Sequence, residues 1–261
     1  MSVYIWSTEI SNAYDSTTWI TWVYIRPNGT EQKIRPAKWE PWADTVAYYP
    51  LTSTTTNTDQ SGNWHTLTTF NWITFETLAS WKSVARFNGS SSGNTCKANT
   101  DEFSVWNTWT LSIWANLENN GGSYPNKYIL FRNGYQQNNN QARIVIFTAW
   151  YGYVSVGNCW SSGAWDYMSN ISPITDGDWH HYVCVSELDK LSLYIDWSLV
   201  WNNNTSITAT SSTGRIYIAS NDDSYYWCKW LISEAIVDEA VWSASDVAKY
   251  YNDTKADYWI S

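Results

Sequence analysis

Hydrophobic and polar residues alternate along residues 179–201 in a pattern typical of paired β-strands. Every second residue of 181–186 shares one face of an extended chain, and the same period of two returns over 191–195. The polar segment 187–190 separates the two runs. The pattern therefore predicts an antiparallel hairpin with a short charged loop.

Short strand-like runs separated by turn residues follow one another through most of the remaining chain. They are residues 46–51, 83–87, 109–117, 127–132, 142–149, 215–220 and 231–237. Many short strands with turn punctuation are typical of two packed sheets. We therefore predict an all-β fold, a two-sheet antiparallel jelly-roll sandwich, over residues 45–261.

One helix is predicted near the end of the chain, over residues 244–251. Ser243 is a good N-cap, and Asp246, three residues later, completes a variant of the capping box. Residues spaced at i, i+3 and i+4 from Val247 share an apolar face that can dock on the sheet. Asn252 is expected to end the helix.

The first part of the chain is organised differently. Residues 1–38 are predicted to be a small β appendage, in which Val-Tyr-Ile occurs twice and Asn28-Gly29 marks a hairpin turn. Residues 39–44, which include Pro41, are predicted to be a linker. The appendage is too short for a large core, so we expect it to lean on a neighbouring domain or a partner chain.

Composition narrows the class of protein. The chain has 261 residues, of which 44% are hydrophobic and 15% charged, and its formal net charge is −9. An acidic chain lacks the basic face that phosphate binding needs, so no nucleic-acid partner is expected. No run of about 18 apolar residues is present, so no membrane span is expected. The first residues also lack the basic and apolar regions of a secretory signal.

The four cysteines define neither a metal site nor a disulfide framework. None is in a CxxC pair, and the three histidines do not complete a zinc spacing. Cys184 falls inside a predicted strand and is expected to be a buried free thiol. The sequence does not decide which of Cys96, Cys159, Cys184 and Cys228, if any, form disulfides. The cysteines therefore do not indicate whether the protein resides in an oxidising or a reducing compartment.

Seven segments, in order along the chain, resemble the concanavalin A-like (laminin-G-type) jelly-roll domain. They read VAYYPL, DQSGNWH, SVARFNG, TWTLSIWANL, DGDWHHYVCV, LYIDWSLV and WLISEAIVDEAVWSASDVAKYY. The likeness covers residues 44–253. It implies two antiparallel sheets packed face to face, edge loops that bind sugars and, in many members, a structural calcium ion.

Residues 1–38 resemble the short β segments at the front of bacteriophage virion and tail proteins. Such proteins leave the cell by lysis, so they need no signal peptide. The resemblance implies contact with other virion proteins through this segment, and a virion or extracellular location.

The concanavalin A-like resemblance also brings in glucanases, which carry a Glu-x-Asp-x-(x)-Glu pattern on one strand. Alternate residues of a strand share a face, which places those acids together. This chain has only Glu187 and Asp189, at a hairpin tip and without the third acid, so we interpret them as solvated loop charges. His180 and His181 have no accompanying Ser or Cys nucleophile pattern and are expected to be structural. We therefore predict no enzyme activity.

Four residues are candidate calcium ligands. They are Asp59, Asn63, Glu234 and Asp238. Calcium takes about six to eight oxygens from carboxylates, amides and carbonyls, which these side chains could supply in part. The alternative for Asp238 is a polar turn before the helix.

Aromatic residues in two polar regions are the candidate ligand-binding residues. They are Tyr151, Tyr153, Trp160, Trp165, Tyr225, Tyr226 and Trp227. Rigid amphipathic rings stack well on sugars. The leading hypothesis is therefore a non-catalytic carbohydrate-binding module of a phage virion or tail that contacts cell-surface glycans. The alternative for the rings is that they fill the edge of the sandwich. The alternative function is a virion decoration or a cell-surface adhesion protein without its own glycan ligand.

Tryptophan stands at several positions where a turn would ordinarily have glycine. The chain has 21 Trp and 12 Gly, although a β sandwich is rich in turns. The turn-like positions are Trp6, Trp64, Trp72, Trp81, Trp197 and Trp230. Trp114, Trp179 and Trp242 occupy ordinary positions instead. We hypothesise that the gene uses UGA for glycine and that Trp stands in its place; a genuinely Trp-rich binder is the alternative.

Overall fold

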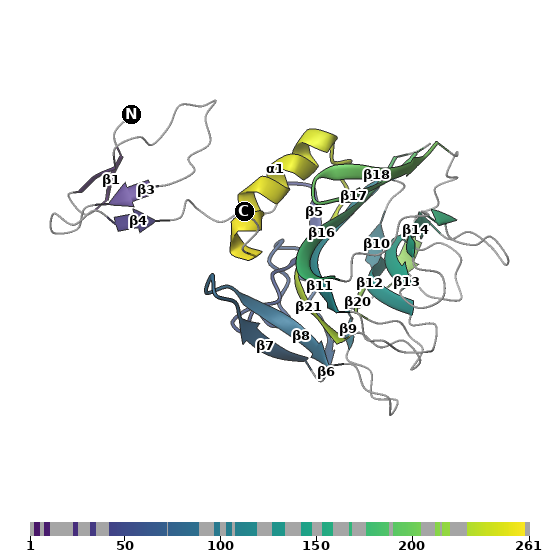
Figure 1. Cartoon of the computed structure of the whole chain (residues 1–261), viewed down its shortest axis with the longest axis horizontal. Helices are drawn as coiled ribbons and strands as arrows, with labels where there is room; N and C mark the ends of the chain where they lie inside the picture. The colour runs from purple at the N-terminus through teal and green to yellow at the C-terminus, as the bar shows by residue number, and fades with distance from the viewer. Residues whose placement is uncertain are drawn as a thin grey trace. The chain divides into compact units, whose positions relative to one another are not determined.

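Figure 1 shows the computed structural model of the chain. The residues that it describes are 3–5, 8–10, 23–25, 32–34, 42–71, 73–88, 97–99, 103–105, 108–118, 127–133, 142–147, 153–158, 167–168, 176–187, 190–204, 212–214, 216–219 and 229–258. The chain divides into two units, Met1–Glu40 and Pro41–Ser261. Each unit is described by itself.

The larger unit is built on an eight-stranded antiparallel sheet. Its order is β18 (Ser198–Asn203), β17 (Leu191–Ile195), β16 (Asp176–Ser186), β11 (Trp109–Glu118), β21 (Lys229–Asp238), β8 (Ser83–Asn88) and β7 (Ile73–Thr77), with β5 (Thr45–Tyr49) also paired to β21. The strands β5 and β8 pair with successive halves of β21. The late strand β21 therefore pairs with two strands from the first part of the larger unit.

A second antiparallel sheet has seven strands. Its order is β15 (Tyr167–Met168), β14 (Tyr153–Asn158), β13 (Ala142–Phe147), β12 (Lys127–Asn133), β20 (Ile216–Ile218), β9 (Lys97–Asn99) and β6 (Thr69–Asn71). A separate pair joins β10 (Phe103–Val105) to β19 (Ser212–Gly214). Ile216 and Ile218 of β20 lie in one buried cluster with Leu111 of β11 and Leu193 of β17. The two sheets therefore share a core, and the predicted antiparallel sandwich is confirmed.

The hairpin predicted from the alternating pattern is present as β16 and β17. Cys184 lies opposite Leu193, and the Glu187 N–H donates to the Lys190 carbonyl at 2.8 Å across the tip. Tyr182 and Cys184 point into the core between the sheets. Cys184 is buried and free, as predicted, and its burial raises the pKa of the thiol.

The C-terminal helix α1 (Ala244–Thr254) covers the opposite face of the eight-stranded sheet (Figure 1). Its predicted capping box is confirmed: the Asp246 N–H donates to Ser243 Oγ at 3.2 Å, and the Ser243 N–H donates to Asp246 Oδ2 at 2.8 Å. The ring of Trp114 stacks on Tyr251 with 5.5 Å between centroids. The helix therefore docks through the face that its spacing predicts.

The predicted end of the helix at Asn252 is wrong. The helix runs to Thr254 and continues as the 3-10 helix η2 (Lys255–Tyr258). Thr254 is buried and accepts a hydrogen bond from Trp114 Nε1 at 3.1 Å. Asn252 donates through Nδ2 to the Ala248 carbonyl at 2.8 Å, within the helix. Packing of Thr254 on the sheet therefore stabilises a helix that continues beyond Asn252, although asparagine often ends a helix.

The described residues of the smaller unit form two short antiparallel pairs. They are β1 (Val3–Ile5) with β2 (Thr8–Ile10), and β3 (Val23–Ile25) with β4 (Gln32–Ile34). The pairing of β3 with β4 is the hairpin predicted around Asn28-Gly29, although those two residues lie outside the described part of the chain.

Candidate functional site

The aromatic residues predicted to bind a sugar fall largely outside the described part of the chain. Tyr151 comes between β13 and β14, and Trp160 and Trp165 come between β14 and β15. The segment Tyr225 to Trp227 precedes β21. Tyr153 is the first residue of β14, of which the backbone is described. All seven therefore stay predictions.

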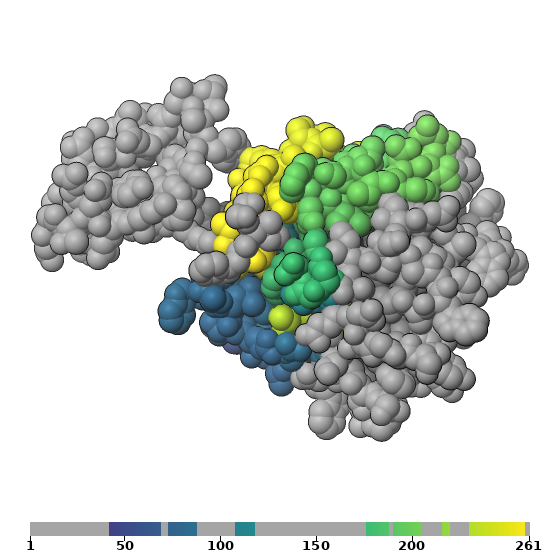
Figure 2. Space-filling view, in the orientation of Figure 1, coloured from purple at the N-terminus to yellow at the C-terminus, as the bar shows by residue number. Residues whose placement is uncertain are grey.

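The exposed aromatic and large apolar residues that the structure does describe lie on turns, on the edge strand β18 and, for Val241, in the segment before α1. Trp64 and Trp81 are 89% and 87% exposed. Trp197 is 49% exposed and packs on Tyr251, with 4.7 Å between ring centroids. Figure 2 shows the β17–β18 region, in green, beside the yellow helix that carries Tyr251.

Asp59 organises the polar loop that follows β5. Its Oδ1 accepts from the N–H groups of Tyr48, at 3.0 Å, and Ser61, at 2.8 Å. Its Oδ2 accepts from Ser61 Oγ at 2.8 Å and from the His65 N–H at 3.0 Å. Asn63 also contacts β5, donating to the Thr45 carbonyl at 2.9 Å. These two candidate calcium ligands therefore fasten the loop to β5.

Asp238 stands at the end of β21 and is buried. Its oxygens accept from Trp242 Nε1 at 3.0 Å and from the Ala240 N–H at 2.8 Å. Burial raises the pKa of this carboxyl, and the hydrogen bonds from Trp242 and Ala240 oppose the rise only in part. The carboxyl joins the sheet to the segment before α1.

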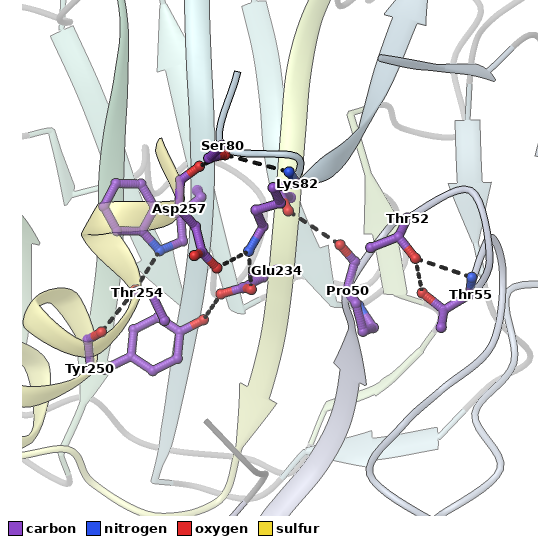
Figure 3. A network of polar contacts seen from close by, with 11 residues as sticks. Pro50, Thr52, Thr55, Ser80, Lys82, Glu234, Tyr250, Thr254 and Asp257 are labelled. Atoms are coloured by element: carbon purple, nitrogen blue, oxygen red, sulfur yellow. Dashed lines mark hydrogen bonds and ion pairs between the residues drawn. The ribbon is translucent and has the colours of Figure 1, made fainter. Parts of the chain in front are cut away.

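Glu234 is the centre of a buried polar network between the sheet and the C-terminal helices (Figure 3). Lys82 Nζ forms ion pairs with Glu234 and, at 3.2 Å, with Asp257. The Tyr250 hydroxyl donates to Glu234 Oε2 at 2.6 Å. Ser80 Oγ donates to the carbonyl of Asp257 at 2.5 Å. The network links the β7–β8 loop, β21, α1 and η2.

The described acids do not form a metal cluster. Within the described ranges, no group of three or more His, Cys, Asp and Glu side chains lies close enough to hold an ion. Asp59, Glu234 and Asp238 each accept hydrogen bonds or ion pairs from protein groups instead. Calcium binding stays a prediction.

A serine and a histidine meet on the helix-covered face of the sheet. Ser112 Oγ and His181 Nε2 share a hydrogen bond of 2.7 Å, and both residues are fully buried. Burial lowers the pKa of His181 to about 3, although the charges of Asp196 and Glu234 oppose it, so the ring is neutral. The ring stacks on Trp114 with 4.9 Å between centroids. A nucleophile would need access to a substrate, so this pair is structural, as the sequence predicts for His181.

The adjacent His180 behaves in the opposite way. Burial disfavours its charged form, but hydrogen bonds and charges from Asp196 and Asp176 outweigh burial and raise its pKa. His180 Nδ1 lies 2.5 Å from Asp196 Oδ2, and Nε2 lies 3.2 Å from Asp176. This cluster holds the start of β16 against the turn between β17 and β18.

The sequence pattern does not identify Lys82 and Tyr250 as partners of Glu234, or Asp257 as the second partner of Lys82. Lys82 and Glu234 are 152 residues apart, and no local pattern connects them. The only local sign is a lysine at a loop end directly before a strand, which is ordinary on a protein surface.

Comparisons with known proteins find solved structures of the same fold but no relative by sequence. No protein-family model matches the chain, and no curated protein matches it. Among solved structures, the binding domain of botulinum neurotoxin serotype D/C superposes with a TM-score of 0.63 and 13% identity, over 80% of this chain and 52% of that one. The chain thus spans about half the length of this neurotoxin domain.

Two further solved structures are described with a bound sugar. Domain 4 of an extracellular arabinanase from Geobacillus stearothermophilus, in complex with arabinotriose, gives a TM-score of 0.60 and 18% identity, over 80% of this chain and 98% of that domain. The ligand-binding domain of botulinum neurotoxin serotype D, in complex with N-acetylneuraminic acid, gives 0.62 and 11%, over 80% and 50%. The chain shares the β-sandwich fold of these binding domains.

None of the helices in the described ranges is both long enough and apolar enough to cross a membrane.

Proposed function

We propose that this protein is a carbohydrate-recognition module without catalytic activity. The supporting observation is the match of the sandwich, over 80% of the chain, to binding domains solved with arabinotriose and N-acetylneuraminic acid. The match to the arabinanase domain covers 98% of that domain, so the shared part is a complete sandwich. Glycans are therefore the proposed partners.

The chemistry of the described residues is consistent with recognition. Ser112 and His181 are sealed beneath α1, and Glu234 and Asp238 hold the helix segment to the sheet. Glu187 forms an ion pair with Lys190 at 3.1 Å, at the tip of the β16–β17 hairpin. This ion pair agrees with the interpretation of Glu187 as a loop charge rather than one of the two carboxylates that glycoside hydrolysis requires.

The proposed sugar contacts are the loop aromatics, from Tyr151 to Trp165 and from Tyr225 to Trp227. Tyrosine and tryptophan rings combine an apolar face with a polar edge, which suits the two faces of a sugar ring. The finer proposal is that the protein belongs to a phage virion or tail and touches cell-surface glycans, with residues 1–38 as its attachment segment. The support for that step is the sequence resemblance alone.

A glycan array probed with the full chain tests the proposal. The panel contains arabino-oligosaccharides, sialylated glycans and bacterial surface polysaccharides. We expect a saturable signal on at least one class, and calorimetry with that saccharide should show at least a tenfold loss of affinity in Tyr225→Ala with Tyr226→Ala.

The matched controls for these variants are Trp64→Ala and Trp81→Ala, which remove exposed rings from other loops. Their affinity should equal that of the parent chain. Absence of binding across the whole panel would contradict the proposal and favour a virion decoration or adhesion protein without a glycan ligand.

A further inference from the structure

Three of the tryptophans in the described part of the chain lie in backbone conformations that favour glycine. The φ angles of Trp64, Trp81 and Trp197 are 65°, 68° and 65°. In this left-handed region the Cβ of an L-residue crowds the backbone, and a bulky side chain is a rare occupant. These rings are also among the most exposed large side chains described, so burial does little to offset the strain.

The turn between β17 and β18 shows the requirement most clearly. Ile195 pairs with Ser198, which leaves Asp196 and Trp197 as a two-residue loop, and their φ angles are 48° and 65°. Two positive φ angles define a turn for which Asp-Gly is a preferred sequence. The Asp196 N–H donates to the His181 carbonyl at 3.0 Å, and Asp196 Oδ1 accepts from the His181 N–H at 2.9 Å. The turn is thus held in place by β16.

The turn between β7 and β8 is of a different type, but it also requires a residue with a positive φ angle. The Trp81 N–H donates to the Leu78 carbonyl at 2.8 Å, and the Leu78 N–H donates to the Lys82 carbonyl at 2.8 Å. A hairpin loop of three residues ordinarily ends in a left-handed residue, and that residue is ordinarily glycine. Trp81 occupies this last position.

Trp64 follows Gly62 and Asn63 in the loop that Asp59 organises. Asn63 donates to the carbonyl of Thr45, and the His65 N–H donates to Asp59. Both neighbours of Trp64 are therefore fastened, and the backbone between them has little freedom to leave the left-handed region.

The remaining non-glycine residues with a left-handed backbone, among those the structure describes, are held there by their surroundings. Leu51, Ala219 and Glu234 are all buried, so packing holds them, and Asp196 is held by β16. Tryptophans within strands behave ordinarily: Trp114 is fully buried and pairs with His181 and Ser233. Exposure together with positive φ therefore separates Trp64, Trp81 and Trp197 from the other described tryptophans.

Trp230 requires a correction. The sequence pattern placed it with the strand-breaking tryptophans, but it lies inside β21, opposite Phe87, and belongs to the buried core. Trp6 and Trp72 lie outside the described residues, so their assignment stays a prediction.

We infer that positions 64, 81 and 197 are glycine positions, and that the natural protein has glycine at all three. One substitution mechanism accounts for every case: a gene in which UGA specifies glycine was read as if UGA specified tryptophan. The alternative is three independent mutations from glycine to tryptophan, each in a different turn. The inference that these positions are glycine does not depend on the proposed function. The same misreading could, however, have placed Trp160, Trp165 and Trp227 in the sequence, whereas it cannot produce a tyrosine. The tyrosines are therefore the firmer candidates for sugar contacts.

The codons of the gene test the inference directly. We expect UGA at positions 64, 81 and 197, and UGG at positions 114, 179, 230 and 242. UGG at the three turn positions would overturn it. UGA at the buried positions as well would also overturn it, because UGA would then specify tryptophan throughout.

Folding measurements on the tryptophan-containing chain provide an independent test. Trp64→Gly and Trp81→Gly should each raise the folding equilibrium constant about three- to tenfold, because glycine relieves the left-handed strain at some entropic cost. Trp64→Ala and Trp81→Ala remove the same ring but keep a Cβ, so they should gain clearly less. Equal gains for Ala and Gly would show that ring exposure, not backbone strain, is responsible, and would contradict the inference.

Trp201→Gly is the matched control at a tryptophan within a strand. Trp201 is partly buried against the core and lies in β18, four residues after Trp197. Its replacement should lower the folding equilibrium constant, and a gain there would remove the distinction between the two groups of tryptophans.

Discussion

At the scale of single residues, His181 makes the stability of the fold depend on acidity. The pKa of His181 is lowered from 6.5 to about 3 in the folded chain, so below pH 6.5 the unfolded chain binds a proton that the folded chain does not. The free energy of unfolding should therefore fall by about 1.4 kcal/mol per pH unit between about pH 6 and pH 3 from this residue alone. Urea unfolding over a pH series measures the slope.

The double variant Ser112→Ala with His181→Phe should show a shallower slope over this range, because it removes both partners of the buried pair. His180→Gln is the control. The raised pKa of His180 gives a contribution that is complete below about pH 6.5 and is lost as the pH rises through the folded pKa. That variant should therefore keep the acid slope of the parent chain; its loss there would contradict the assignment to His181.

Lys82 is predicted to matter because of what its removal leaves behind. Its side chain is 6% exposed, and it is the cation beside Glu234 and Asp257. Lys82→Met should cost about 3–5 kcal/mol of unfolding free energy, since a buried carboxylate loses its ion-pair partner. Chemical denaturation measures the loss.

Adding Glu234→Gln to Lys82→Met should restore part of that stability, because a neutral amide replaces the unpaired carboxylate. The Glu234→Gln single variant completes the double-mutant cycle. Strictly additive losses would show that the two side chains do not interact in solution.

At the scale of elements, the N-terminal cap of α1 is the most local prediction. Ser243→Ala should lower the unfolding free energy by about 1 kcal/mol, because the Asp246 N–H loses its acceptor. Ser53→Ala, at an exposed serine in the loop after β5, is the control and should have a much smaller effect. Equal losses in the two variants would argue against the capping box.

Elements with a strong local pattern could be predicted from the sequence. The period of two in residues 181–195 specified both the β16–β17 hairpin and the faces of its strands, since alternate residues must point to opposite sides. Ser243 and Asp246 marked the start of α1, because a capping box is also a local pattern. The end of α1 could not be predicted, because it depends on Thr254 and Tyr258 packing on Trp114, far away in the chain.

At the scale of the whole molecule, the many short strands were enough to predict two packed antiparallel sheets. The buried polar contacts could not be predicted from the sequence. The contacts of Lys82 with Glu234 and Asp257 join residues whose separation in sequence carries no signal. The assignment of Trp230 to a turn position is wrong for a related reason, because its place inside β21 depends on pairing with β8, which no local pattern shows. The predicted sugar-contact loops remain sequence predictions.

We propose that the molecule binds a sugar and leaves it intact. Saturation-transfer difference NMR of the full chain with an oligosaccharide selected on the array tests both parts in one sample. We predict saturation transfer to ring protons of the sugar, and unchanged anomeric signals after prolonged incubation. Absence of transfer for every saccharide, or new reducing-end signals, would contradict the account.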